Sequence, residues 1–264
     1  MRRITPTAIA IAALCAALAG AAPGVAQAGP APTTTPAISA APSVQHRQPA
    51  AARPKPRPGT KRVNCARVKC IALTFDDGPG PGTERVVKAL HAKGAHATFF
   101  MLGSSAKARP QTVRKVARTR GMEIGAHTMT HRQLTGLSDS AIRAEMVTNR
   151  QQLTRLSGRP VRLVRPPYGA RNARVDHIAK QARLAEVLWN VDTEDWRNRS
   201  TAITTQRALS GARAGSIILM HDIHPSTVRA VPGIVNALQR RGFHLVTVSE
   251  LLGSTRPGRA YYSR

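Results

Sequence analysis

The segment that decides the fold reads IALTFDDGPGPGTERVVKALHAKGAHATFFM and spans residues 71–101. It begins and ends with short apolar runs, Ile71–Phe75 and Ala97–Met101, and a longer amphipathic stretch separates them. Two such runs joined in this way are typical of a βαβ unit, whose strands lie parallel in one sheet. Asp76 and Asp77 directly follow the first run, so a carboxylate pair is expected at the end of a strand.

The same alternation continues along the rest of the chain. Seven strands are expected, at Ile71–Phe75, Ala97–Met101, Met122–Ala126, Val161–Val164, Ala185–Val191, Ser216–Met220 and Phe243–Val248. Helices with start signals include Pro110–Arg120, a stretch from Ser138 to Leu156, and Pro225–Arg241. The pattern predicts an α/β fold, an incomplete TIM-barrel-like barrel in a single catalytic domain over residues 63–253, followed by a basic C-terminal tail at 254–264.

Composition narrows the class of protein. The 264 residues are 42% hydrophobic, enough for a sizeable core, and no apolar run after the N-terminus reaches the roughly 18 residues that span a bilayer. Lys and Arg number 40 against 13 Asp and Glu, a net charge of +27. Eight of the basic residues precede Val63, so the remainder carries 32 basic against 13 acidic residues, or +19. No nucleic-acid module accompanies this charge, and only 3% of residues are aromatic, so no nucleic-acid partner is expected.

The N-terminus has the features of a signal peptide. Arg2 and Arg3 precede an apolar run at Ile9–Ala22, and Ala26-Gln27-Ala28 supplies a small-x-small cleavage site. Residues 1–28 are therefore expected to be removed, and the protein is expected to be secreted, either free outside the cell or associated with the cell wall. A membrane anchor is the disfavoured alternative, because Pro23 ends the apolar run too early for a crossing.

Residues 29–62 are expected to form a basic linker. They are rich in Pro, Ala and Thr, with PAPTTTP at 30–36 and RPKPRPG at 53–59, and lack hydrophobic periodicity. The linker is either a solvated spacer or a contact to an anionic cell wall. Signal cleavage leaves Cys65 and Cys70 as the two cysteines, and one disulfide between them is the simplest expectation for an exported protein.

Polar residues follow strand after strand. Besides Asp76 and Asp77, this group contains His127, His131, Arg165 to Tyr168, Asp192 to Trp196, and His221. In a parallel barrel, all of them fall on the carboxyl-terminal rim, where such folds carry their chemistry.

Two histidines on this rim predict a metal site. His127 and His131 are four residues apart, so both imidazoles can face one point, and a carboxylate from Asp76 or Asp77 completes a three-ligand site with open positions. Two histidines and one carboxylate also describe a non-haem iron oxygenase. The remaining groups favour hydrolysis of a carbonyl compound, because the second aspartate is free to act as a base aligned by Arg165, and His221 can act as an acid.

Five motifs resemble a known family in order and spacing. They are TFDDGP at 74–79, HTMTH at 127–131, RPPYG at 165–169, DTEDW at 192–196 and ILMH at 218–221. As a set they resemble the polysaccharide deacetylases of carbohydrate esterase family four. The resemblance covers essentially Val63 to Leu252, and no motif is broken. It implies a distorted (β/α)7 barrel.

The resemblance also implies a role for each matching residue. Asp76 would be the catalytic base and His221 the acid, with Arg165 orienting Asp76 and Asp195 pairing with His221. The implied metal ligands are Asp77, His127 and His131, for zinc and sometimes cobalt or nickel. The Tyr168 N–H would help to stabilise the oxyanion. The substrate pocket is expected to include Trp196, Leu219 and Pro167.

Other conspicuous residues receive modest interpretations. His224 is expected to be a rim histidine rather than a fourth ligand, Trp189 a core residue and Glu194 a solvated side chain. No role is assigned to His91, His96, His177 and His244.

The leading functional hypothesis is a secreted metal-dependent deacetylase that removes N-acetyl groups from peptidoglycan or a chitin-like polymer with a metal-activated water. An acetylxylan O-acetyl esterase and a non-catalytic cationic wall-binding protein are the alternatives. The +19 region suits an anionic polymer and favours peptidoglycan over chitooligosaccharide. The sequence does not indicate an oligomeric state.

Overall fold

The computed structural model describes residues 63–264. The expected signal peptide and linker, residues 1–62, lie outside the described residues. Among residues 63–264, no helix has the length and apolar composition that a membrane crossing needs.

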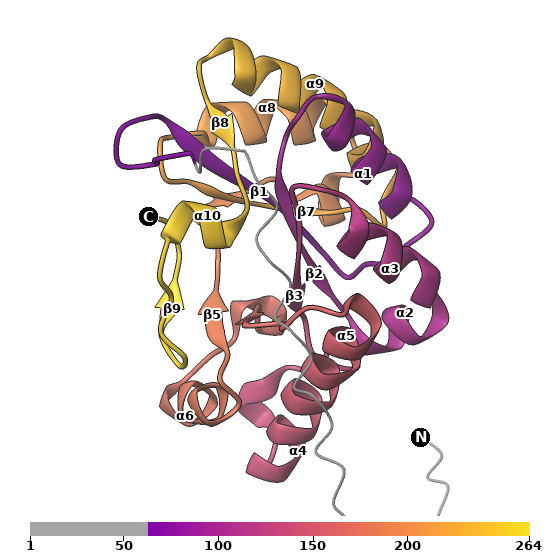
Figure 1. The fold of residues 1–264 in the computed structure, drawn as a ribbon, viewed down its shortest axis with the longest axis vertical. Coiled ribbons are helices and arrows are strands. Elements are labelled where there is room, and N and C mark those ends of the chain that lie inside the picture. Colours follow the sequence, from indigo (N-terminus) through magenta and orange to yellow (C-terminus); the bar gives the residue numbers. More distant parts are fainter. Residues whose placement is uncertain (1–62) are drawn as a thin grey trace, which may run out of the picture. The chain divides into compact units, whose positions relative to one another are not determined.

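Parallel strands form one curved sheet that is centred on β1, Cys70–Asp76 (Figure 1). The strand order is β6-β7-β1-β2-β3-β4-β5-β9, and β8 pairs with the start of β1. The other strands are β2 Ala97–Met101, β3 Met122–Ala126, β4 Leu163–Val164, β5 Ala185–Val187, β6 Val191–Asp192, β7 Ile217–His221, β8 His244–Leu245 and β9 Ala260–Tyr261. Because β5 and β6 do not pair, the barrel is open, as the predicted incomplete (β/α)7 barrel requires.

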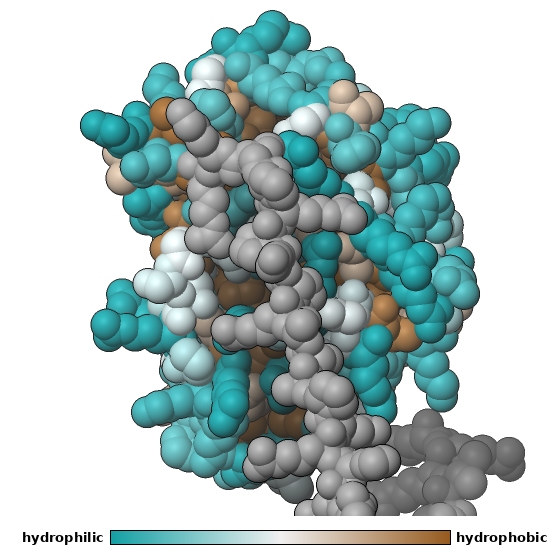
Figure 2. Space-filling view, viewed as in Figure 1, coloured by the Kyte–Doolittle hydropathy of each residue, from teal (hydrophilic) through white to brown (hydrophobic). Residues whose placement is uncertain are grey.

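Helices surround the outer side of the strands (Figure 1). They are α1 Thr83–Ala92, α2 Gly103–Ala108, α3 Pro110–Arg118, α4 Asp139–Arg143, α5 Asn149–Ser157, α6 Ala173–Gln181, α7 Asp195–Asn198, α8 Thr201–Gly211, α9 Pro225–Arg240 and α10 Val248–Leu252. The main core lies between strands and helices, where Phe75 of β1 stacks on Phe99 of β2. Figure 2 shows that the outward face of this helical layer is predominantly hydrophilic.

Strand register brings the polar residues of the rim together. Asp76 of β1 lies opposite His221 of β7 in the strand register. The two strands are far apart in the sequence, since the Thr74 hydroxyl of β1 donates to the Ile218 carbonyl of β7 across 144 positions. Ala126 of β3 lies opposite Val164 of β4, so the residues that follow, His127 and Arg165, are also neighbours. The predicted clustering on one rim is therefore confirmed.

Two predicted elements are interrupted, and a buried polar side chain lies at each interruption. The expected helix over 138–156 is divided by a π-helical segment, Ala144–Thr148, which carries the buried Glu145. The expected strand over 185–191 is divided into β5 and β6. Between them, the Val187 and Leu188 carbonyls accept hydrogen bonds from the Arg165 guanidinium.

The prediction of a C-terminal tail is wrong, because residues 254–264 belong to the folded domain. β9 pairs in parallel with β5, and Ser263 forms an isolated antiparallel bridge with Ser216, just before β7. The Arg264 N–H also donates to the Gly215 carbonyl. This segment thus supplies pairing to the β5 edge, which would otherwise present unpaired backbone groups. The compact unit extends to Arg264.

The predicted disulfide between Cys65 and Cys70 is present and attaches the start of the domain to β1. The cysteines are 5 positions apart, so the closed loop is short. Its effect on the unfolded chain is smaller than the roughly 3 kcal/mol of a 15-residue loop. We expect the double variant Cys65→Ser/Cys70→Ser to fold with a modestly lower Tm, measured by calorimetry. Loss of folding, or two free thiols found in secreted protein by mass spectrometry, would contradict this prediction.

Candidate active site

A cavity of about 580 Å³ lies at the carboxyl-terminal ends of the strands. Eight of the predicted site residues line it: Asp76, Asp77, His127, His131, Tyr168, Trp196, Leu219 and His221. Arg165 and Asp195 lie beneath the cavity, fully buried. The expectation that Pro167 lines the pocket is wrong, because Pro167 is buried outside the lining and the neighbouring Pro166 forms the wall instead. Asp192 and His224, expected on the rim without a role, also line the cavity, and Trp189, expected in the core, forms part of its wall. Sequence reasoning missed Arg199 and Ile223.

Asp77, His127 and His131 form a cluster of the kind that holds a divalent metal. Asp77 Oδ1 lies 3.4 Å from His127 Nε2 and 3.4 Å from His131 Nε2. This oxygen is buried and has no hydrogen-bond partner among the described residues. Burial opposes ionisation of Asp77, but its interaction with His127, together with the nearby His221 and His131, lowers its pKa to about 2. Two imidazole nitrogens and an ionised carboxylate fit zinc or a similar metal with open positions.

Surrounding contacts orient both histidines. His127 Nδ1 lies 2.7 Å from the Arg165 carbonyl, so Nδ1 carries the proton and Nε2 is left as the free nitrogen. His131 Nδ1 lies 3.2 Å from the Tyr168 hydroxyl. Glu145 accepts hydrogen bonds from the Met129 and Thr130 N–H groups, which holds the loop between the histidines. The π-helical segment carries Glu145, in line with the frequent occurrence of such segments at functional sites.

Asp76 lies beside this cluster and is 2% exposed. Its Oδ1 accepts a hydrogen bond of 2.8 Å from Arg165 Nη1, while Oδ2 is 3.8 Å from His127 Nε2. Arg165 is fixed by further donation to Thr74 Oγ1, Val187 O and Leu188 O, and its guanidinium lies 4.3 Å from the centre of the Phe100 ring. Asp76 therefore has one oxygen held and one oxygen directed to the cavity.

His221 and Asp195 form a second ion pair on the opposite side of the cluster. Asp195 Oδ1 lies 2.7 Å from His221 Nδ1, and Asp195 Oδ2 accepts from the His221 N–H and from the Thr227 hydroxyl. Burial lowers the pKa of His221, but the hydrogen bond and charge of Asp195, with Asp76 and Asp77, outweigh it and raise this pKa to about 9. His221 Nε2 is 4.0 Å from Asp77 Oδ2, so a protonated imidazole faces the cluster.

Tyr168 is 68% exposed and has a left-handed backbone, with φ of 61°. Its N–H has no hydrogen-bond acceptor among residues 63–264, so the donor is free. Strained backbone of this kind is common at functional sites. Asp77, His131 and Arg199 share the positive φ, so four residues with this backbone line one cavity.

Asp222 is a buried carboxyl that sequence reasoning left without a role. Burial raises the pKa of Asp222 to about 7, and neither carboxyl oxygen has a hydrogen-bond partner among the described residues. A Cβ added to Gly78 would lie 2.7 Å from Asp222 Oδ1. Gly78 thus allows the loop after Asp77 to approach Asp222 closely. The glycine of TFDDGP is the signal that could have indicated this contact.

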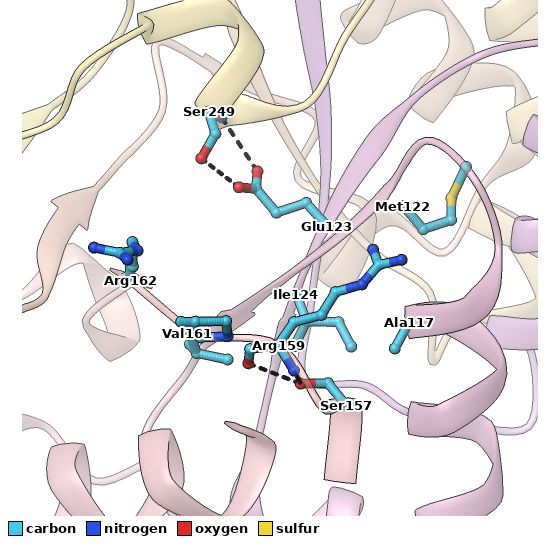
Figure 3. Close-up of a pocket in the computed structure, with 10 residues that line it drawn as sticks. Ala117, Met122, Glu123, Ile124, Ser157, Arg159, Val161, Arg162 and Ser249 are labelled. Carbon is cyan, nitrogen blue, oxygen red and sulfur yellow. Dashed lines mark hydrogen bonds between the residues drawn. The ribbon is translucent and has the colours of Figure 1, made fainter. Parts of the chain in front are cut away.

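A second hollow lies at the opposite ends of the strands (Figure 3). Glu123 at the start of β3 is half-buried there, and its loss of solvent raises the pKa of its carboxyl group. Glu123 accepts hydrogen bonds from Ser249 of α10 and from Thr98 of β2. Because these contacts occupy its carboxylate, we interpret Glu123 as a connection between α10 and the sheet.

Fold and site together define a partial (β/α) barrel with a candidate metal centre on its rim. The sequence model described as polysaccharide deacetylase matches residues 63–187. A peptidoglycan-N-acetylglucosamine deacetylase from Bacillus cereus is 37% identical over 190 residues, which cover 70% of this chain and 88% of that protein. The chain belongs to the polysaccharide deacetylase family.

Other relatives differ in length and in activity. The peptidoglycan-N-acetylglucosamine deacetylase PgdA of Listeria monocytogenes is 37% identical over 198 residues, covering 74% of this chain but only 42% of that protein. The structure of a T48 deacetylase with substrate superposes with a TM-score of 0.72 at 41% identity, covering 75% of this chain and 99% of that one. BA3943 of Bacillus anthracis, described as a CE4 family pseudoenzyme, has a TM-score of 0.67 at 26% identity, covering 74% of this chain and 70% of that one.

Proposed function

We propose that this protein hydrolyses N-acetyl groups on the amino sugars of a cell-wall polysaccharide. The observation that carries the proposal is the Asp77, His127 and His131 cluster, with a free oxygen of Asp76 and a protonated His221 beside it. A non-catalytic protein has no need of a buried carboxylate and a charged imidazole at one point. A bound divalent metal, most suitably zinc, would be held by the three cluster residues and would polarise the acetyl carbonyl as a Lewis acid.

The residues of this chain divide the proton transfers between them. Asp76 takes a proton from the attacking water through Oδ2, since Arg165 occupies Oδ1 and fixes the carboxylate. The water oxygen bonds to the acetyl carbon, and the free Tyr168 N–H stabilises the negative charge that develops on the carbonyl oxygen. His221, held by Asp195, donates its proton to the amine as the C–N bond breaks. The products are acetate and a free amino sugar.

Peptidoglycan is the proposed polymer. Two of the relatives named above are peptidoglycan-N-acetylglucosamine deacetylases, and the +19 net charge beyond residue 62 suits an anionic wall. The expected signal peptide and the Cys65–Cys70 disulfide support action outside the cytoplasm.

Acetate release tests the proposal directly. The purified mature protein should be stripped of metal, reloaded with zinc, cobalt or nickel, and assayed on peptidoglycan, chitooligosaccharides and acetylxylan in parallel. We expect metal-dependent release from peptidoglycan. No release from any substrate with any metal would overturn the proposal, and release from acetylxylan alone would replace it with an esterase.

His221→Ala is expected to slow amide hydrolysis by about 100-fold or more, and hydrolysis of an activated aryl acetate much less. The amide nitrogen must be protonated to leave, whereas an aryl oxide leaves without an acid. Turnover of both substrates should be measured beside His244→Ala. That control removes an exposed histidine at the opposite end of β1. Equal losses on both substrates would show that His221 is not the acid.

A further inference from the structure

Arg199 lies on the cavity wall beyond His221. It directly follows α7 and is exposed, with a left-handed backbone at φ of 50°. The imidazole of His224 separates it from His221, with 5.8 Å between the centres of the two histidine rings. Arg199 therefore borders the space next to the reacting acetyl group rather than the space in which that group reacts.

Two contacts hold the Arg199 side chain in place. Its Nε donates to the Trp196 carbonyl at 2.6 Å, and its Nη1 donates to His224 Nδ1 at 2.9 Å. Burial, and then the charge of Arg199, lower the pKa of His224, so this imidazole accepts the hydrogen bond in its neutral form. No described residue accepts a hydrogen bond from Nη2. The guanidinium is thus fixed with one nitrogen free, and little conformational entropy remains to be lost when it binds a ligand.

The charge of Arg199 has no counter-ion among residues 63–264. Its neighbours differ, since Arg207 lies 2.5 Å and Arg197 4.0 Å from Glu194 Oε2. Asp192 is the one cavity carboxylate outside the site chemistry, and no ion pair within 4.0 Å joins it to Arg199. Its Oδ1 instead accepts from the Glu194 N–H. An exposed guanidinium on a cavity wall, held in place and without a carboxylate partner, is suited to bind a carboxylate from a ligand.

We infer that Arg199 determines specificity by binding a sugar carboxylate of the glycan strand, such as the lactyl carboxylate that muramic acid carries. This inference rests on the proposed deacetylase function and narrows its substrate to an anionic glycan. The planar, positively charged guanidinium matches a carboxylate in shape and in charge. The hydroxyl groups of a chitin-like strand are neutral and offer no negative charge to the guanidinium.

The test uses two glycan strands that differ in one group. The first is a peptide-free oligosaccharide of alternating N-acetylglucosamine and N-acetylmuramic acid. The second is its methyl ester, in which the carboxylate loses its charge and gains one methyl group. Kd is measured by calorimetry in the Asp76→Asn background, and kcat/KM for acetate release in the otherwise unmodified protein. Both are repeated in Arg199→Gln, Arg199→Lys and the control Arg197→Gln, whose target is an exposed arginine of α7 outside the cavity lining.

We expect the free acid to be preferred over the ester by about tenfold in Kd, because a hydrogen bond between charged groups contributes on this scale. Arg199→Gln should reduce this ratio to near one, Arg199→Lys should keep part of it, and Arg197→Gln all of it. Equal Kd values for acid and ester in the Asp76→Asn protein that retains Arg199 would overturn the inference. So would an unchanged ratio in folded Arg199→Gln and Arg199→Lys. An Arg199-dependent ratio without acetate release from either strand would support the inference and contradict the deacetylase function.

Discussion

Asp76→Asn is expected to reduce acetate release by at least about 100-fold while the protein retains its metal, because a positioned base contributes 10²- to 10⁴-fold. The three cluster residues are unchanged in this variant, and the amide oxygen can still accept the hydrogen bond from Arg165. Binding and turnover should therefore separate. The measurements are zinc content by atomic emission and acetate release by a coupled assay.

The variant also removes the negative charge that faces a buried arginine. Arg165 keeps its hydrogen bonds to Thr74, Val187 and Leu188, so we expect a lower Tm but a folded protein. Asp139→Asn, on the exposed first turn of α4, is the matched control and should behave as the unmodified protein. Loss of zinc from Asp76→Asn would assign Asp76 to the metal, and retained turnover would exclude it as the base.

His131→Ala is expected to lose both metal and activity. It leaves two protein ligands, Asp77 and His127, and removal of a ligand should reduce metal affinity by more than the 10- to 100-fold that removal of an outer partner costs. His131 is half-buried on the rim, outside the hydrophobic core, so the fold should persist. Metal affinity is measured by competition with a chelating dye, and acetate release at saturating and limiting zinc.

His177→Ala is the control for this experiment, because His177 on α6 bonds only to Gln181 among the described residues. It should retain zinc and turnover. Normal metal content together with normal acetate release in His131→Ala would show that the site is assigned wrongly. Release restored by excess zinc would instead confirm that the loss came from affinity.

Together, these two variants also separate catalysis from wall binding. The fold is shared with a protein described as a pseudoenzyme, so the experiment measures hydrolysis and polymer binding separately. A purely wall-binding protein would lose no acetate release in either variant, because it would have none to lose. The metal-retaining Asp76→Asn protein can then report polymer binding separately from hydrolysis.

Sequence alone determined the element pattern and the rim. The strands at 97–101 and 122–126 have the bounds predicted for them, because a short apolar run is a local signal that the sequence carries by itself. The residues that follow β1, β3 and β7 were predicted to meet because parallel strands carry their ends to one side. The motifs likewise named eight of the residues that line the cavity.

Tertiary structure decided what depends on contacts between distant segments. The pairing of Asp76 with His221 follows from the register between β1 and β7, and no local pattern specifies a register. Residues 254–264 are a basic tail by sequence, yet the open edge of β5 pairs with Ala260–Tyr261 and makes them a strand. Arg199 had no motif to mark it. Its place on the cavity wall arises from hydrogen bonds to the Trp196 carbonyl and to His224, which lies 25 positions away and meets Arg199 only after the chain has folded.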